Sequence, residues 1–81
     1  MDPAPCSYSF HAREQMGRRG VAEEAVEHVL DRYHTRIPAE PRVPARPAEI
    51  FIGTYDGREL KVYVEIGTKP PYVKTVAWVE R

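Results

Sequence analysis

The chain has 81 residues, and its 12 Lys and Arg residues balance its 12 Asp and Glu residues, so the formal net charge at pH 7 is zero. We expect one domain at this length, with only ~60–65% of the unfolded surface buried on folding. Zero net charge argues against non-specific coating of nucleic acid, which needs many basic contacts with phosphates, and weakens a role in RNA binding. The single cysteine, Cys6, excludes an internal disulfide and a metal site built from thiolates.

The N-terminal residues 1–7 are expected to be flexible. They contain no apolar run, so we predict no signal peptide, and no later segment approaches the length of a transmembrane helix. A cytoplasmic location of the bacterial type, without membrane contact, is therefore the expectation.

A very short first strand that closes with Tyr8-Ser9-Phe10 is predicted, followed by a short first helix. Ser9 can cap this helix, because its hydroxyl can accept a hydrogen bond from an N–H group of the first turn. The helix is expected to end at Arg19, whose charge suits the negative end of the helix dipole, and Gly20 suits the left-handed conformation that follows. The expected apolar contacts of this helix are Phe10, Ala12 and Met16.

A second helix is indicated more strongly by an apolar stripe. Glu23 and Glu24 fall in its first turn, where the helix dipole favours carboxylates, and Arg32 falls in its last. Ala22 occupies the cap position and has no side chain that could bond to the first turn, at a cost of about 1 kcal/mol. The stripe at helical spacing consists of Ala25, Val26, Val29, Leu30 and Tyr33.

Residues 37–48 are predicted to form a proline-rich connector. Prolines at positions 38, 41, 44 and 47 have the three-residue period of polyproline II, so their rings would lie along one edge. Such a segment can serve as a ligand for a protein module with an aromatic groove. The interpretation we favour is a stiff linker between the second helix and the sheet, since modules of that kind are rare in bacteria.

The second half of the chain is predicted to form an antiparallel meander. Residues 49–55 and 58–66 are strand-like, and Asp56-Gly57 between them is a strong signal for a two-residue hairpin turn. Residues 67–72 are expected to form a loop, and residues 73–80 the last strand.

The alternation of side chains along these strands assigns the two faces of the sheet. A two-residue turn pairs Phe51 with Val62 and directs both toward the helices, and Ile66 is taken to lie opposite Val73. The residues expected toward the helices are Phe51, Leu60, Val62, Val64, Ile66, Val73, Thr75, Ala77 and Val79. Those expected on the other, open face include Ile50, Ile52, Lys61, Tyr63, Lys74, Val76 and Trp78. Because that mixture is too apolar for a face that contacts only water, Trp78, Ile50 and Ile52 are predicted interface residues.

The segment from Tyr8 to Leu30 resembles a known pattern. It contains His11-Ala12, then Met16 with Arg19-Gly20-Val21, an acidic first turn at Glu23-Glu24 and the apolar pair Val29-Leu30. This pattern is typical of a small bacterial domain family of unknown function, placed near the RelE/ParE toxin superfamily and similar in layout to BrnT toxins. The resemblance implies one RelE-like α+β domain over residues 1–81, with two N-terminal helices packed on one face of a three- to four-stranded antiparallel sheet.

The resemblance also implies cleavage of RNA without a metal or a cofactor. Toxins of the RelE type promote attack of a ribose 2′-hydroxyl on the neighbouring phosphate, which requires a base, an acid and cations for the charge that develops on phosphorus. Their catalytic residues vary, so no position can be carried over one to one. The candidates here are Lys61, Tyr63, Lys74, Arg81 and His11, with Glu65 as a second candidate for the base.

A basic cluster surrounds the first helix. Arg13, Arg18 and Arg19 are candidates for contacts with RNA phosphates, although a solvated helix end with local salt bridges explains the same charges. His28 is expected to be a surface residue and His34 a structural residue at a helix end. The sequence contains no glycine-rich phosphate loop, no nucleophile elbow and no histidine pair at metal-binding spacing on one helix face.

Two functions therefore stay open. One is a toxin-like endoribonuclease that acts on RNA, free or on the ribosome, and that a small antitoxin protein neutralises. The other is a non-catalytic protein-interaction domain on the same fold, which the neutral charge favours. The family resemblance narrowly favours the toxin-like endoribonuclease. A homodimer formed through the open face, or an antitoxin segment bound there, would cover its apolar residues.

Overall fold

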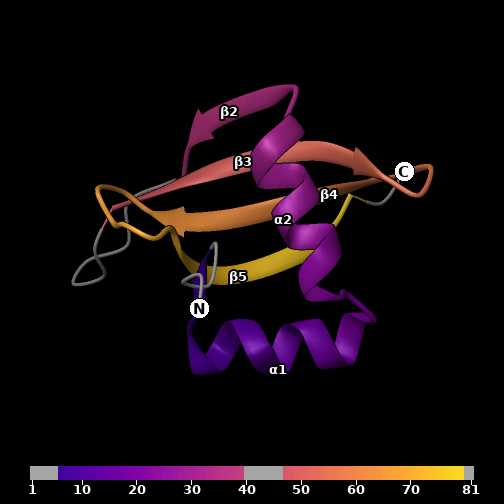
Figure 1. Ribbon diagram of the computed structural model, residues 1–81, viewed down its shortest axis with the longest axis horizontal. Helices are drawn as coiled ribbons and strands as arrows, with labels where there is room; N and C mark the ends of the chain where they lie inside the picture. Colours follow the sequence, from indigo (N-terminus) through magenta and orange to yellow (C-terminus); the bar gives the residue numbers. More distant parts are fainter. Residues whose placement is uncertain (1–5, 40–46, 80–81) are drawn as a thin grey trace, which may run out of the picture.

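The computed structural model describes residues 6–39 and 47–79, which form two helices and one five-stranded sheet (Figure 1). In chain order the elements are β1 (Ser7–Tyr8), α1 (Phe10–Arg19), α2 (Glu23–Arg32), β2 (Thr35–Pro38), β3 (Ala48–Tyr55), β4 (Arg58–Glu65) and β5 (Tyr72–Trp78). The strand order is β1-β5-β4-β3-β2, with β1 parallel to β5 and the other neighbours antiparallel. The predicted α+β class with two helices is confirmed. The prediction of three or four antiparallel strands is wrong, because β1 and β2 extend the sheet at both edges and β1 makes it mixed.

Cys6 and Ser7 already belong to the folded structure. The amide of Ser7 donates a hydrogen bond to the carbonyl of Pro71 at 2.9 Å, and Cys6 is only 3% exposed. The prediction of flexibility over residues 1–7 is therefore wrong for the last two of them, whereas residues 1–5 lie outside the described ranges. Cys6 and Ser7 are held by β5 and by the loop before it. The sequence around Cys6 and Ser7 does not indicate these distant partners.

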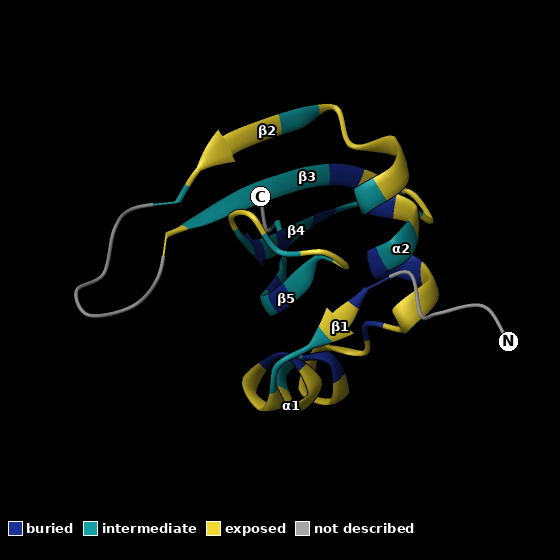
Figure 2. Cartoon of the chain, turned by 60° about the vertical axis from the view of Figure 1, so that its left-hand side comes forward, coloured by how far each residue is buried: buried dark blue, intermediate teal, exposed yellow. Residues whose placement is uncertain are grey.

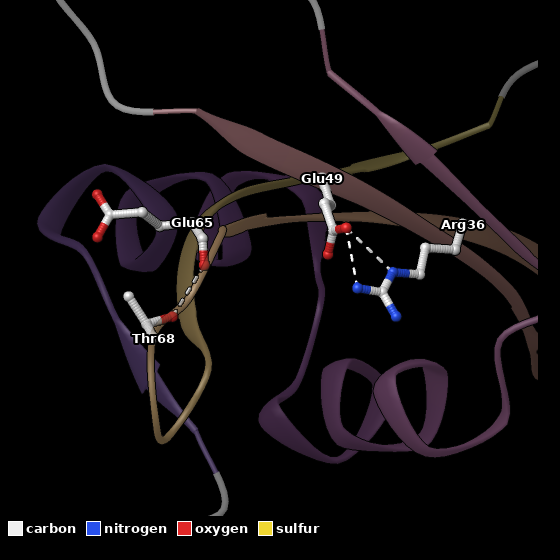
Figure 3. Close-up of polar contacts among 4 residues, drawn as sticks. All are labelled: Arg36, Glu49, Glu65 and Thr68. Carbon is white, nitrogen blue, oxygen red and sulfur yellow. Dashed lines mark hydrogen bonds and ion pairs between the residues drawn. The ribbon is translucent and has the colours of Figure 1, made fainter.

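Strand β2 takes the place of the first part of the predicted connector. Arg36 binds the carboxylate of Glu49 on β3 at 2.9 Å (Figure 3), and its guanidinium lies 5.3 Å from the centre of the Phe51 ring. Pro38 is tolerated here because it lies at the end of an edge strand, where a missing N–H group costs little. The prediction of a linker is wrong at Ile37 and Pro38, and the central residues 40–46 lie outside the described ranges.

Helix α1 lies along the β5 edge of the sheet (Figure 1) and has the predicted caps. The hydroxyl of Ser9 accepts a hydrogen bond from the amide of Ala12 at 2.9 Å, and Gly20 after the last turn has a φ of 66°. Ala12 and Met16 are buried, but Phe10 is 86% exposed. The predicted apolar contact of Phe10 is wrong, because a residue two positions before Ala12 lies on the opposite side of the helix.

Helix α2 crosses one face of the sheet over β3 and β4 (Figure 1). The fully buried residues of its apolar stripe are Ala25, Val26 and Val29. The predicted extension of this stripe to Tyr33 is wrong, because Tyr33 follows the helix and is 40% exposed, with its ring edge-on to that of Phe51. The helix approaches the sheet closely at Gly53, where an added Cβ atom would lie 3.3 Å from the Val29 side chain. Neither helix in the described part of the chain is long and apolar enough to cross a membrane.

The β3–β4 hairpin has the predicted turn and register. Asp56 and Gly57 adopt positive φ angles of 52° and 76°, as two-residue hairpin turns of this kind require. Phe51 pairs with Val62, and Val62 is fully buried against the helices. Tyr63, the next residue, lies on the other face and is partly exposed. The faces predicted for β4 are therefore confirmed.

Strand β5 departs from the predicted register because it contains a β-bulge. Val64 pairs with Val73 and Tyr63 pairs with Thr75, so Lys74 is the additional residue of the bulge. An extra residue reverses the alternation of side chains beyond it.

The bulge corrects the predicted faces of the last strand. Val76 is 1% exposed and Trp78 packs against the core, so the outward orientation predicted for both residues is wrong. Thr75 and Ala77 lie on the open face instead of facing the helices. The inward orientation predicted for Ile66 is also wrong, since β4 ends one residue earlier and Ile66 is 48% exposed.

The hydrophobic core lies between the helices and one face of the sheet, where the buried residues gather (Figure 2). Its members are Cys6, Ala12, Met16, Val21, Ala25, Val26, Val29, Leu60, Val62, Val64, Val73 and Val76. The register places Ile50, Ile52, Lys61 and Tyr63 on the opposite, open face, as predicted.

Candidate functional site

A groove of about 870 Å³ lies on the open face of the sheet, beside α1. Helix α1 forms one wall, and β3, β4 and β5 contribute the floor. The lining residues are Ser9, His11, Gln15, Arg19, Ala39, Ala48, Ile50, Tyr63, Tyr72, Lys74, Thr75, Val76 and Ala77.

Hydrogen bonds to β5 fix both ends of the α1 wall. At the start of the helix, the hydroxyl of Ser9 donates to the carbonyl of Lys74 at 2.9 Å, and the amide of Ser9 donates to the carbonyl of Val73 at 2.9 Å. At its end, the indole N–H of Trp78 donates to the carbonyl of Arg19 at 2.8 Å. Because both ends are bonded to the same strand, the helix cannot turn about its axis without breaking one of these bonds.

The wall presents three polar side chains in one stripe. His11, Gln15 and Arg19 are spaced by four residues and therefore lie on the same side of α1. The side-chain oxygen of Gln15 accepts a hydrogen bond from Nε of Arg19 at 2.9 Å. This bond holds the guanidinium through Nε, and the terminal nitrogens of a guanidinium are well suited to phosphate oxygens.

The floor brings a phenol and an ammonium group into the same groove. Tyr63 on β4 pairs with Thr75 on β5 and with Ile50 on β3, and all three line the groove. Lys74 and Thr75 are consecutive, yet both line it, because the bulge interrupts the alternation of the strand. These residues therefore share one groove with His11.

The hydroxyl group of Thr68 joins the two ends of the loop between β4 and β5. Thr68 donates to the carbonyl of Glu65 at 2.9 Å (Figure 3) and accepts a hydrogen bond from the amide of Tyr72 at 2.9 Å. Tyr72 begins β5 and lines the groove, so this loop sets one end of the floor.

The groove is locally basic although the net charge of the chain is zero. Its ionisable side chains are His11, Arg19, Tyr63, Tyr72 and Lys74. Among the described residues that line it there is no Asp or Glu. A concave surface with cations and no carboxylates attracts anions.

Part of the predicted site is gathered in this groove. The predicted residues that line it are His11, Arg19, Ile50, Tyr63 and Lys74. Lys61 and Ile52 lie on the same face but do not line the groove, and neither does Arg18, which is exposed on α1. Arg81 lies outside the described residues.

Arg13 makes contacts with other parts of the fold. Its Nη1 lies 2.7 Å from the carboxylate of Glu23 on α2, and its guanidinium lies 4.3 Å from the centre of the Tyr8 ring. The hydrogen bond to Glu23 raises the pKa of the Arg13 guanidinium. For Arg13, the structure therefore shows a local salt bridge, which was the second explanation of the basic cluster beside contacts with RNA phosphates.

Sequence reasoning did not identify Gln15, Tyr72 or Thr75 as site residues. The signal for Gln15 was present, because it lies four residues from both His11 and Arg19. Nothing local marks Tyr72 or Thr75, since their positions depend on the bulge and on the loop that Thr68 holds.

The arrangement can bind an anionic group and transfer protons next to it. Imidazole exchanges protons near neutral pH, a phenol can donate a proton, and lysine and arginine stabilise negative charge. No cluster of three or more His, Cys, Asp or Glu side chains within residues 6–39 and 47–79 could hold a metal ion.

Neither a curated protein nor a solved structure matches this chain. A family model does match it, over residues 8–78, and the family is described as a domain of unknown function (DUF4258). The match extends from the end of β1 to the end of β5 and includes every residue of the groove. The predicted membership of a domain family of unknown function is confirmed, and the likeness to RelE/ParE toxins stays a prediction. The chain belongs to the DUF4258 family.

Proposed function

We propose that the chain is a toxin-like endoribonuclease of the RelE type, which binds RNA in the groove and cleaves it without a metal ion. The observation that carries this proposal is the composition of the groove. His11, Tyr63 and Lys74 are far apart in the sequence but line it together with Arg19, and no carboxylate is among the described lining residues. Such a surface attracts phosphates and places groups that transfer protons beside them.

The proposed reaction is attack of a ribose 2′-hydroxyl on the adjacent phosphorus atom. His11 takes the proton of the 2′-hydroxyl as the new O–P bond forms, and Tyr63 donates a proton to the 5′-oxygen as its bond to phosphorus breaks. Arg19 and Lys74 stabilise the negative charge on the phosphoryl oxygens. The products are one strand with a 2′,3′-cyclic phosphate and one with a 5′-hydroxyl.

An antitoxin protein and a cytoplasmic RNA, free or on the ribosome, are the partners in this proposal. The antitoxin would bind over the open face and exclude RNA from the groove. Ile50 in the groove pairs with Ile37 on β2, which is 44% exposed, and this pair supplies apolar area for such a contact. A second copy of the chain could use the same surface.

The alternative is a non-catalytic protein-interaction domain. The apolar part of the groove favours it, since Ala48, Ile50 and Ala77 line the groove next to its polar groups. In that case the groove would bind a protein segment and leave RNA intact.

Cleavage of single-stranded RNA by the purified protein in EDTA tests the proposal. We expect His11→Ala to slow cleavage by about 100-fold, the order of magnitude that a proton-transfer group contributes, and Tyr63→Phe to slow it as well. His28→Ala is a matched control because His28 is also an exposed helical histidine, but on α2. Tyr55→Phe is the control for Tyr63, since it lies on the helix side of β3. Equal rates for His11→Ala and His28→Ala would contradict the proposal, and no cleavage by the wild type would favour the interaction domain.

A further inference from the structure

A chain of hydrogen bonds outside the groove links Thr35, His34 and Glu59. The Nδ1 atom of His34 lies 2.7 Å from the hydroxyl oxygen of Thr35, and Nε2 lies 3.0 Å from Oε1 of Glu59. His34 precedes β2, Thr35 is the first residue of β2, and Glu59 belongs to β4. The sequence predicted only a structural role for His34, because its partner is 25 residues away and is brought to it by folding.

The nature of the groups decides where the protons lie. A carboxylate only accepts hydrogen bonds, so Nε2 of His34 carries the proton that is shared with Glu59. In the neutral imidazole Nδ1 is then the acceptor, and Thr35 donates its hydroxyl proton to it. The carboxylate thus fixes the tautomer and the orientation of the ring, and the ring holds a lone pair against a hydroxyl group. A nucleophile, a base and a group that orients the base are the three parts that activate a hydroxyl group for attack.

Small molecules can reach this hydroxyl group. The side chain of His34 is 47% exposed and that of Glu59 is 34% exposed, and Thr35 is partly exposed. Glu59 also lines a hollow of about 340 Å³ together with Gly57, Arg58 and Val79. This hollow borders the carboxylate end of the chain of hydrogen bonds, and access to Thr35 itself rests on the exposure of its own side chain and of His34.

A cation lies on the same face of the sheet. Thr35 pairs with Ile52, and Ile52 pairs with Lys61, so the three residues occupy one row across β2, β3 and β4. Lys61 lies two strands from Thr35 and adds a positive charge to the same face of the sheet.

We propose that Thr35, His34 and Glu59 form a second reactive site, which hydrolyses small activated carboxylic esters. The hydroxyl oxygen of Thr35 bonds to the ester carbonyl carbon as its proton moves to Nδ1 of His34, and the carbonyl electron pair moves onto oxygen. When that electron pair re-forms the carbonyl double bond, the bond to the leaving alcohol breaks. The alcohol departs with the proton from His34. Water then attacks the acyl-threonine, again losing a proton to His34. The carboxylic acid leaves as Thr35 regains its proton from His34.

Release of p-nitrophenolate from p-nitrophenyl acetate by the purified chain tests this site, without any RNA. Thr35→Val keeps a β-branched residue on β2 and removes the nucleophile, and His34→Gln removes the base. We expect each to lower the rate by about 100-fold, toward the spontaneous rate, and Glu59→Gln to lower it less. Thr35→Ser keeps the hydroxyl group and should retain most of the activity. Thr54→Val is the matched control, because Thr54 is an exposed threonine on the neighbouring strand β3.

Peptide mass spectrometry after an acid quench locates the acetyl group. Acetylation of Thr35 that is lost in His34→Gln and kept in Thr54→Val supports the proposal. Release that persists in Thr35→Val but is lost in His34→Gln would overturn it, because the imidazole would then itself be the nucleophile. Equal release by all variants would overturn it too, as would the loss of activity in Thr35→Ser, which would indicate a structural role for the side chain at this position.

Discussion

The indole N–H of Trp78 donates a hydrogen bond to the carbonyl of Arg19 across 2.8 Å and so joins the last strand to the last turn of α1. Carbonyls of a last helical turn have no partner within the helix, and here the strand supplies one. The ring of Trp78 also contacts β4, since the guanidinium of Arg58 lies over it, 4.0 Å from its centre. The position of the α1 wall of the groove therefore depends on a residue of β5.

Replacement of Trp78 is expected to affect stability. Trp78→Phe keeps an aromatic ring but loses the N–H donor, and we expect the free energy of unfolding in urea to fall by about 1 kcal/mol. Trp78→Glu should cost more, because it places a charge against the core. If Trp78 faced outward, Trp78→Glu would leave the free energy of unfolding unchanged and would weaken only association with a partner. A Trp78→Glu variant as stable as the wild type would contradict the position of this ring on the helix side.

Two glycines should respond oppositely to alanine. At Gly53 an added Cβ would lie 3.3 Å from the Val29 side chain and 3.4 Å from the Cα atom of Tyr33, so α2 must shift. We expect Gly53→Ala to lower the free energy of unfolding by about 1–2 kcal/mol. Gly17 lies in α1 with open space around it, and Gly17→Ala should raise stability by ~0.5–1 kcal/mol. Chemical denaturation of both variants checks this, and a stabilised Gly53→Ala would show that α2 has room to move.

Stability should decline in mild alkali because of Cys6. Burial raises the pKa of its thiol above the ordinary value of 9.0, and burial also raises the pKa of Tyr8, to whose hydroxyl the thiol donates at 3.0 Å. The folded state thus holds the thiol proton more tightly than the unfolded state does. The resulting stability is fully present below the ordinary value and is lost as the pH rises from it toward the folded value. Thermal unfolding from about pH 8 to about pH 10 should show a steeper decline for the wild type than for Cys6→Ala. Parallel declines would contradict this linkage.

Two arginines of the same helix should differ in their effect on RNA binding. Arg19 lines the groove, whereas Arg13 binds Glu23. We expect Arg19→Ala to weaken binding of a labelled single-stranded RNA and to lower the slope of log affinity against log salt by about one unit, because one phosphate contact is lost. Arg13→Ala should leave both quantities unchanged. Fluorescence anisotropy at several salt concentrations measures them, and equal effects of the two substitutions would indicate that RNA contacts the helix elsewhere.

Local signals in the sequence were sufficient for much of the fold. Ser9 and Gly20 mark the ends of α1, and Asp56-Gly57 sets the hairpin register, because each acts through its own backbone or its near neighbours. The bulge at Lys74 had no such signal, since it depends on how β5 pairs with β4. The orientation of Trp78 depends on that bulge, so it could not be predicted.

The candidate site could be predicted only in part for the same reason. His11 was identified through a family-like pattern, and Tyr63 through the alternation of β4, which the structure confirms. Their common groove requires α1 to lie along the β5 edge, and no spacing in the sequence encodes that packing. The contact between His34 and Glu59 could not be predicted either, because it joins the residue before β2 to β4, with β3 between them.

The most direct measurement of the central claim uses a DNA oligonucleotide that contains a single ribonucleotide. Cleavage that starts from a 2′-hydroxyl can occur only at that position, so mass spectrometry of the products identifies the reaction. We expect the wild type in EDTA to cleave on the 3′ side of the ribonucleotide and to leave a 2′,3′-cyclic phosphate, and His11→Ala to do so far more slowly. An oligonucleotide that stays intact while bound to the wild type, or cleavage of the matching all-DNA strand, would contradict it.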